Sequence, residues 1–445
     1  MISLLLFISF GCSNNQSKVT DSDSHGDSSH QDTSETNEST PSQDTLSLQS
    51  EFANETEHMV EVDDIFAIWW DPNAADHSVD LPILFNWLKE IRTDCLTNLG
   101  MEDPPNPAAG HYYNVYIHHG TDDSFPSNWG NGQGTNTFGL PFLTLPSGAH
   151  LEHGNVLHEG FHIFQYSANS TGFAYSGDSQ WYIEAAAQWY QAMTLPNEVM
   201  TFIEAGAIVE NPHLALWHSF NNEAPGDPTD WLFQVRQYGM HTWLYYLSEV
   251  VGIDPDIISD GFYAETNLLP QAYHFDRVGE PLRTYFADWA AHNTGGLDYL
   301  TPEQVERAWL EVDLVGDPNN RNPNVIELED NTDFGDFVPH PALSPRGWGY
   351  NVVKINLSEA ASFQLLLGGQ PQGSEGAEAH FEGRIVIGGE SGVRYQNIDM
   401  LDSLSGTASV ETTAEDTVLY VVVAAVPEHF TGNQTYTYTL NILKQ

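Results

Sequence analysis

Basic residues are scarce in this sequence. Lys and Arg number 13 against 62 Asp and Glu in 445 residues, which gives a formal net charge of −49. Charged residues make up only 17% of the chain, so the imbalance comes from missing Lys and Arg rather than from excess acid. A surface this negative repels the phosphates of nucleic acids, and we therefore exclude nucleic acid as a partner.

Cysteine and long apolar runs are scarce as well. The two cysteines, Cys12 and Cys95, are too few for a disulfide-dense scaffold. The apolar stretch within residues 1–11 is too short to cross a bilayer as a helix, which needs about 20 residues, so we expect no transmembrane helix in the mature chain. Cys95 falls in a helical pattern, where we expect a small buried hydrophobe.

The N-terminal residues have the features of an export signal. Residues 1–12 resemble a bacterial lipoprotein signal, with an apolar run, then Gly11 and Cys12, then polar residues. In that class the cysteine is lipidated, so we expect a lipid anchor at Cys12. An ordinary cleaved signal is the alternative, and both predict an extracytoplasmic protein: a lipoprotein of the outer membrane or cell surface, or a secreted protein. Residues 13–58 are polar and predict a disordered acidic tether.

The rest of the chain predicts an α+β fold. Residues 59–312 form a mostly helical domain with a small sheet, residues 313–345 a linker rich in Pro, Asn and Asp, and residues 346–445 a β-sandwich. Strand patterns cover residues 59–71, 111–118 and 138–146, and helix patterns cover residues 80–99, 152–168, 178–194, 197–209, 228–250, 279–293 and 301–312. Near the start of the sandwich, Trp348 and Tyr350 are expected in the seam between domains.

One helical segment contains a pattern suited to metal chemistry. Residues 155–167 read NVLHEGFHIFQYS and contain an HExxH motif. Residues four apart share a helix face, so His158 and His162 can bind one metal ion through two imidazoles. Glu159 lies beside them and can reach a water molecule as general base. By residue frequencies, this motif is expected about 0.05 times by chance in such a chain.

A zinc site of this type needs a third protein ligand and an open fourth position. Glu184 lies in the helical segment DSQWYIEAAAQWY, residues 178–190, where apolar neighbours surround it. A carboxylate flanked on both sides by apolar residues is unusual, and this favours Glu184 as the third ligand. Asp178, Glu198 and Glu204 are the competing carboxylates.

The two motifs together resemble those of the gluzincins, zinc metallopeptidases with HExxH and a glutamate ligand on a following helix. The resemblance covers residues 60–310 in layout. It implies a zincin-like catalytic domain with Zn²⁺ as cofactor, His158, His162 and Glu184 as ligands, and Glu159 as base. In that family an edge strand before the first helix binds the substrate backbone, and residues 138–146 occupy that place here.

The resemblance also implies residues further along the chain. In gluzincins a Tyr or His on a later helix stabilises the oxyanion, and Tyr238 and His241 are the candidates here. Thermolysin-like members have an Asp four residues after the glutamate ligand, which holds a histidine ligand. Gln188 stands at that position in this chain and is the candidate for the same role.

The expected function is zinc-dependent hydrolysis of peptide bonds, with an endopeptidase favoured because no segment typical of aminopeptidases is present. The partner is then a peptide or protein substrate. The alternative is a cell-surface binding or adhesion protein on a zincin scaffold that is non-catalytic or acts on something other than peptides. Glu159 distinguishes the two, because a site that only binds has no need of a base beside its ligands. The sequence does not indicate the oligomeric state.

Overall fold

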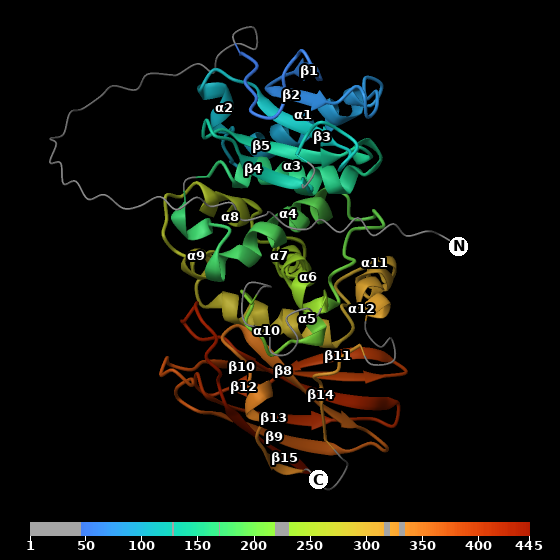
Figure 1. The fold of residues 1–445 in the computed structure, drawn as a ribbon. Helices are drawn as coiled ribbons and strands as arrows, with labels where there is room; N and C mark the ends of the chain where they lie inside the picture. The colour runs from blue at the N-terminus through green and yellow to red at the C-terminus, as the bar shows by residue number, and fades with distance from the viewer. Residues whose placement is uncertain (1–45, 127–128, 169, 219–230, 316–320, 329–333) are drawn as a thin grey trace, which may run out of the picture. The chain divides into compact units, whose positions relative to one another are not determined.

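The computed structural model describes residues 46–126, 129–168, 170–218, 231–315, 321–328 and 334–445 (Figure 1). The predicted signal, with Cys12, and most of the predicted tether lie outside these residues. The chain forms two compact units, residues up to 168 and residues from 169 onward. Their boundary falls inside the segment 59–312, for which the sequence predicts one domain. Among the described residues, no helix is both long and apolar enough to cross a membrane.

The N-terminal unit is built on a mixed sheet of five strands in the order β1-β2-β3-β5-β4. Strands β2, β3 and β5 are parallel to one another, while β1 and β4 run antiparallel to their neighbours at the two edges. The strands are β1 (Met59–Asp63), β2 (Phe66–Trp70), β3 (Tyr113–His118), β4 (Gly132–Thr135) and β5 (Pro141–Pro146).

Two of the predicted strands differ from the observed ones. Residues 59–71 form a hairpin rather than one strand, because Asp64 adopts a left-handed φ of 53° and turns the chain back. The segment 138–146 was predicted as an edge strand or an extended segment, but β5 is a strand that lies between β3 and β4. Its prolines stand at the first and last positions of the strand, where a missing donor costs little. The edge of the sheet beside β5 is instead formed by β4, which lies in the Gly/Asn-rich segment that follows Trp129.

Helices α1 (Leu81–Thr97) and α3 (His153–Gln165) pack against each other, and α3 also contacts β4 and β5 (Figure 1). Gly160 makes the helix contact close, since a β-carbon there would lie 2.6 Å from Cδ1 of Ile91. Cys95 is fully buried on α1 and unbonded, as predicted, and burial raises the pKa of its thiol. A short helix, α2 (Pro105–Ala108), precedes β3.

Part of the predicted tether is folded. Residues 46–58 lie against the sheet, where the ring of Phe52 packs edge-on against Tyr116, Trp129 and Phe142 at 5.0–5.7 Å between centroids. The Ser50 hydroxyl also bonds the Tyr116 hydroxyl at 2.6 Å. The prediction of a tether to residue 58 is therefore wrong from residue 46 onward, because a few apolar side chains in a polar segment suffice to dock it on an aromatic surface.

The C-terminal unit begins with helices. Residues 197–209 are mostly turns rather than the predicted helix, and the helix predicted at 228–250 is divided near Gly239 and ends in a π-helical turn. The helices are α4 (Gln180–Thr194), α5 (Ala207–Glu210), α6 (Trp231–Gly239), α7 (His241–Tyr245), the π-helix η5 (Tyr246–Val251), α8 (Asp256–Ser259), α9 (Pro270–Val278), α10 (Pro281–Thr294), α11 (Pro302–Ala308) and α12 (Leu310–Val315).

The same unit ends in two five-stranded sheets with the orders β11-β10-β14-β8-β6 and β12-β13-β9-β15-β7. Their inward side chains, among them Val353, Leu365, Val421 and Leu440, form one apolar core, so the sheets make a β-sandwich. The strands are β6 (Ile326–Leu328), β7 (Gly335–Phe337), β8 (Gly349–Asn356), β9 (Ser362–Gly369), β10 (Phe381–Gly389), β11 (Gly392–Asn397), β12 (Asp399–Met400), β13 (Ser405–Glu411), β14 (Asp416–Ala425) and β15 (Tyr438–Lys444).

The fold is thus α+β, as predicted. Strands β6 and β7 lie in the segment 313–345, so this predicted linker contributes an edge strand to each sheet. Helix α10 packs on β10, β14 and β8. Trp348 and Tyr350 are 2% and 3% exposed in this helix–sandwich seam, as expected.

Candidate metal centre

Helix α3 carries the HExxH motif. Its helical period places His158 and His162 one turn apart on one face, with Glu159 beside them. The three side chains are 6%, 3% and 3% exposed in the order of the chain. Polar groups this enclosed cost free energy unless they are hydrogen-bonded or hold a ligand. Their burial distinguishes this motif from a chance pair of histidines on a helix surface.

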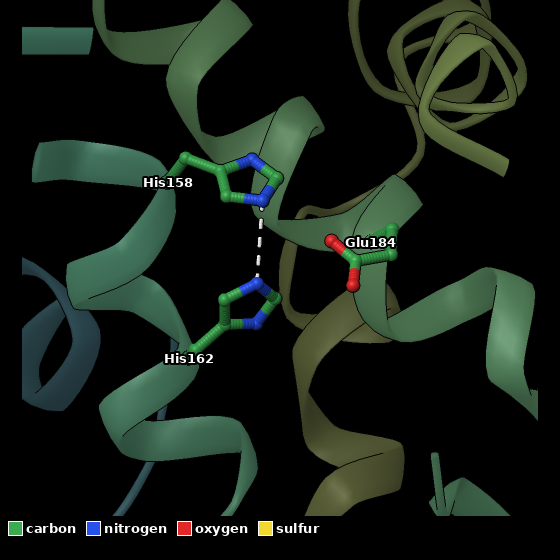
Figure 2. A group of neighbouring side chains, drawn as sticks. All are labelled: His158, His162 and Glu184. Carbon is green, nitrogen blue, oxygen red and sulfur yellow. Dashed lines mark hydrogen bonds between the residues drawn. The ribbon is translucent and has the colours of Figure 1, made fainter. Parts of the chain in front are cut away.

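The two imidazoles face each other through their Nε2 atoms, which lie 3.2 Å apart (Figure 2). Nδ1 of His162 lies 2.6 Å from Oε1 of Gln165, one turn further along the helix. An amide oxygen can only accept, so Nδ1 of His162 carries the hydrogen and Nε2 carries the lone pair. Gln165 therefore holds His162 in the tautomer that a metal ligand requires.

Glu184 completes the group. One donor atom from each of His158, His162 and Glu184 lies within 4.8 Å of the others, and in Figure 2 the carboxylate points toward the two imidazoles. Glu184 is 3% exposed. Of the four carboxylates considered from the sequence, this is the one that groups with the histidines. Asp178 instead accepts the amide of Gly432 at 2.9 Å.

The helix that carries Glu184 is fixed by hydrogen bonds from its aromatic side chains. The Tyr182 hydroxyl donates to the carbonyl of Ile258 at 2.7 Å. The indole of Trp181 donates to Gln271 at 3.2 Å, and that of Trp189 to Ser248 at 3.1 Å. The three alanines that follow Glu184 are completely buried, and α4 packs closely on α6 and α7. A helix held at several points gives its carboxylate a defined position.

The donor set fits a zinc ion. Zinc takes imidazole nitrogens at about 2.0–2.1 Å in a tetrahedral arrangement, which places two ligating nitrogens about 3.3 Å apart. The observed 3.2 Å between the Nε2 atoms of His158 and His162 matches this separation. It also suits a hydrogen bond between the rings, so the distance alone does not distinguish the two. The buried carboxylate of Glu184 and the orienting bond from Gln165 favour a metal.

The edge strand β4 holds α3 at the position of Glu159. The side-chain amide of Gln133 on β4 donates to the backbone carbonyl of Glu159 at 3.4 Å. Its oxygen accepts the Tyr113 hydroxyl from β3 at 2.6 Å. Burial raises the pKa of Tyr113 far above its usual range, so this hydroxyl keeps its proton and the bond persists. Gln133 thus connects two strands of the sheet to the motif helix.

The remaining predicted residues lie on the helices that follow. Gln188 is buried one turn after Glu184 on α4. Tyr238 is half-buried near the end of α6, and its carbonyl accepts Nδ1–H of His241, at the start of α7, at 2.8 Å. The ring of His241 is fully buried against Phe202. Their assignments as orienting residue and oxyanion donors stay predictions.

Sequence reasoning missed Gln165 and Gln133. Gln165 could have been found, since it follows His162 by three residues, a spacing that places both on one helix face. Gln133 could not, because its contact with Glu159 depends on how β4 pairs with β5.

No family model matches the sequence, and no curated protein matches it. Among solved structures, one likeness is to the pre-peptidase C-terminal domain of a collagenase from Bacillus anthracis, at 15% identity and a TM-score of 0.18, over 27% of this chain and 93% of that chain. Another is to a family GH115 4-O-methyl-α-glucuronidase with specificity for decorated arabinogalactans, at 9% identity and a TM-score of 0.15, over 77% of this chain and 54% of that chain. Neither likeness carries an argument about function.

Proposed function

We propose that this protein is a zinc-dependent peptidase of the gluzincin type, and that it cleaves within peptide chains. The observation that carries the proposal is the buried group formed by His158, His162 and Glu184, with Glu159 next to a ligand. The hydrogen bond that His162 donates to the Gln165 side-chain oxygen supports it, because metal-binding histidines usually donate their second N–H to such an acceptor.

Each residue then has a defined task. His158 and His162 bind the ion through Nε2, Glu184 binds through a carboxylate oxygen, and Gln165 keeps His162 oriented. Zinc, when bound, acts as a Lewis acid that polarises the peptide carbonyl and lowers the pKa of water.

Glu159 takes a proton from the attacking water and passes it to the departing amine. On a helix it points about 100° away from its neighbour His158, so it would face a water held by the ion rather than the ion itself. Tyr238 and His241 are the proposed donors to the oxyanion.

The free edge of β4 is the proposed docking place for an extended substrate. Strand β4 pairs with β5 on one side, and no other described strand pairs with its opposite side. Such an edge can bind a peptide by adding a strand to the sheet. Gly134 keeps the strand close to its neighbour, because a β-carbon there would collide with the ring of Phe142.

The test is metal analysis together with proteolysis of an unstructured protein such as casein. Wild type is expected to contain about one zinc and to cleave. Glu159→Gln should keep the zinc while turnover falls by roughly 10²–10⁴-fold, the usual worth of a positioned base. Glu90→Gln, the same change at an exposed site on α1, is the matched control and should behave as wild type.

Two results would contradict the proposal. Loss of zinc in Glu159→Gln would make Glu159 part of the metal site rather than a base. Cleavage by Glu159→Gln at the wild-type rate would contradict the proposed peptidase mechanism. The better explanation would then be a cell-surface protein that is non-catalytic or acts on something other than peptides.

We also propose that the protein is exported and lipid-anchored at Cys12. The proposal rests on the sequence of residues 1–12 alone. Labelling of cells with a radioactive fatty acid should mark wild type and Cys95→Ala but not Cys12→Ser. Label retained in Cys12→Ser would contradict the anchor.

A further inference from the structure

The edge strand β4 has side chains on only one of its two faces. Gln133 faces helix α3, because its amide reaches the carbonyl of Glu159. Gly132 and Gly134 alternate with Gln133 along the strand, so they belong to the opposite face of the sheet. On that opposite face β4 therefore presents only its backbone.

Three aromatic rings lie on the same opposite face. Phe142 pairs with Gly134 across the ladder, and its ring covers the glycine, because a β-carbon there would collide with it. Trp129 stacks on Phe142 with ring centroids 6.2 Å apart and an angle of 27° between the planes. Phe52 packs edge-on against both rings, with centroids at 5.0 and 5.1 Å. We call Phe52, Trp129 and Phe142 the aromatic platform.

The aromatic platform is supported from below and partly exposed above. Its three rings are half-buried, whereas Tyr116 and Phe125 beneath them are buried. The centroids of these two rings lie 5.1 and 5.2 Å from that of Trp129. Because buried rings hold the platform in place, a ligand that binds there does not first have to order it.

The outer edge of β4 is accessible next to the aromatic platform. Thr135 is exposed and Gly134 is half-buried, and the exposed surface of a glycine is backbone. Among the described residues, neither forms a backbone hydrogen bond with a segment other than β5. Every second residue of an edge strand points its N–H and C=O away from the sheet, where an extended peptide can pair with them.

A peptide paired with this edge alternates its side chains between the two faces of the sheet. Side chains on one face lie beside Gln133, which contacts the helix of the HExxH motif. Side chains on the other face lie beside the glycines of β4, where the nearest ring is that of Phe142. Because this ring already covers Gly134, an aromatic side chain of the peptide can reach it, whereas a methyl group is too short.

We propose that the aromatic platform binds an aromatic side chain of the substrate, next in sequence to the residue that faces α3. The inference rests on the proposed function and names its substrate class, peptides with an aromatic residue close to the cleaved bond. Contacts between rings favour an aromatic side chain over alanine by about tenfold in affinity. The alternative is that Phe142 only covers a glycine within the sheet and has no part in binding.

Binding of two peptides to Glu159→Gln tests the aromatic platform without cleavage. The peptides have ten residues, carry no charge and differ only at one central position, which is Phe in one and Ala in the other. The absence of charge keeps the negative field of the protein out of the comparison. Fluorescence anisotropy of labelled peptides measures the two Kd values. The Phe peptide is expected to bind about tenfold more tightly, and equal Kd values would overturn the proposal.

Variants of the rings show whether the aromatic platform is responsible. In the Glu159→Gln background, Phe142→Leu and Trp129→Leu should each lower the ratio of the two Kd values from about tenfold to about twofold, because one ring contact is lost. Phe337→Leu, the same change at a half-buried position on β7 of the sandwich, should keep the tenfold ratio. An unchanged ratio in both platform variants would overturn the proposal. If neither variant folds, the two peptides with Glu159→Gln alone decide.

Cleavage by wild type separates a failure of this inference from a failure of the proposed function. Mass spectrometry of an unfolded protein digested by wild type gives the residues around each cleaved bond. Aromatic residues are expected about tenfold above their abundance at one fixed position. Cleavage without this enrichment would overturn the aromatic platform alone. No cleavage at all, together with tighter binding of the Phe peptide, would contradict the peptidase and keep the platform as a peptide-binding surface.

Discussion

Two regions of this protein bury polar side chains, and they differ in where those side chains come from. In the candidate metal centre, His158 and His162 lie four residues apart on one helix, and Gln165 is three residues further on. The second region surrounds Arg236 on α6, whose side chain is 2% exposed. Its neighbouring groups come from residues 213, 346 and 350, more than a hundred residues apart at the extremes. The first arrangement follows from helical spacing, whereas the second exists only once the helices have packed on the sandwich.

The two regions also differ in charge. The metal centre combines two imidazoles with two carboxylates, a set that a divalent cation balances. The Arg236 region holds positive charge with no described carboxylate paired to it. A buried carboxylate can take up a proton when it lacks a partner, but a guanidinium stays charged at any physiological pH. The two kinds of buried charge therefore respond differently to pH.

Removal of both imidazoles should have the largest effect on the metal centre. His158→Ala combined with His162→Ala is expected to lower the zinc content from about one ion to none and to abolish cleavage, because a single carboxylate cannot hold zinc. Elemental analysis of the purified protein measures this. His340→Ala, at an exposed histidine, is the control and should retain the metal. Zinc retained by the double variant would place the metal elsewhere.

Loss of the residue that donates a hydrogen bond to the oxyanion should have the next largest effect on activity. Removal of one such donor usually lowers kcat by about 10²–10³-fold. If Tyr238 is the donor, Tyr238→Phe should show this loss with zinc content unchanged and KM little affected, while His241→Gln should lower kcat only slightly. The reverse order would assign the role to His241. If both Tyr238→Phe and His241→Gln had the wild-type kcat, neither residue would be the oxyanion donor.

Loss of the Gln165 side chain should lower zinc affinity to a smaller extent, because Gln165 acts only by orienting His162. Gln165→Leu removes the acceptor for Nδ1–H, and zinc affinity is expected to fall by about 10–100-fold, as is usual for partners that orient a ligand. Competition with a chelator measures the affinity. Gln165→Glu keeps an acceptor and should restore binding, while Gln396→Leu, at an exposed position on β11, should leave it unchanged. Tight binding by Gln165→Leu would show that the bond is incidental.

Glu204 provides the acidic counterpart of Arg236. Its Oε2 is enclosed without a hydrogen-bond partner, and burial together with Glu311 raises its pKa to about 8. Because the folded pKa lies above the unfolded value of 4.5, the folded state binds the proton more tightly than the unfolded state. Stability is therefore expected to fall as pH rises from about 4.5 to about 8 and to level off above that, by up to about 5 kcal/mol at about 1.4 kcal/mol per pKa unit.

Glu204→Gln should remove this part of the pH dependence and stabilise the protein at pH 8. Urea unfolding at several pH values measures it, with Glu390→Gln at an exposed site as the control. A wild-type pH profile in Glu204→Gln would show that Glu204 ionises freely in the folded protein. Such a result would also weaken the contrast between the two kinds of buried charge.

The structure corrects the sequence analysis mainly where apolar pattern and turn chemistry were ambiguous. Residues 59–71 look like one strand, but Asp64 turns the chain and makes a hairpin. The family resemblance placed residues 138–146 at a sheet edge, yet β5 lies between two strands, and its prolines stand at its ends, where they disturb no central hydrogen bond. Local pattern cannot distinguish these cases, because strand order depends on which neighbours pair across the sheet.

The sequence by itself determined the α+β class, the sandwich and the grouping of His158, Glu159 and His162 on α3. These follow from short-range periodicity, which sets which side chains share a helix face or a strand face. Tertiary structure alone decided which strand lies at the edge of the sheet, that Gln133 reaches Glu159, and that the side chain of Arg236 is buried. Those features depend on contacts between distant segments, and the free energy that selects them comes from packing rather than from local spacing.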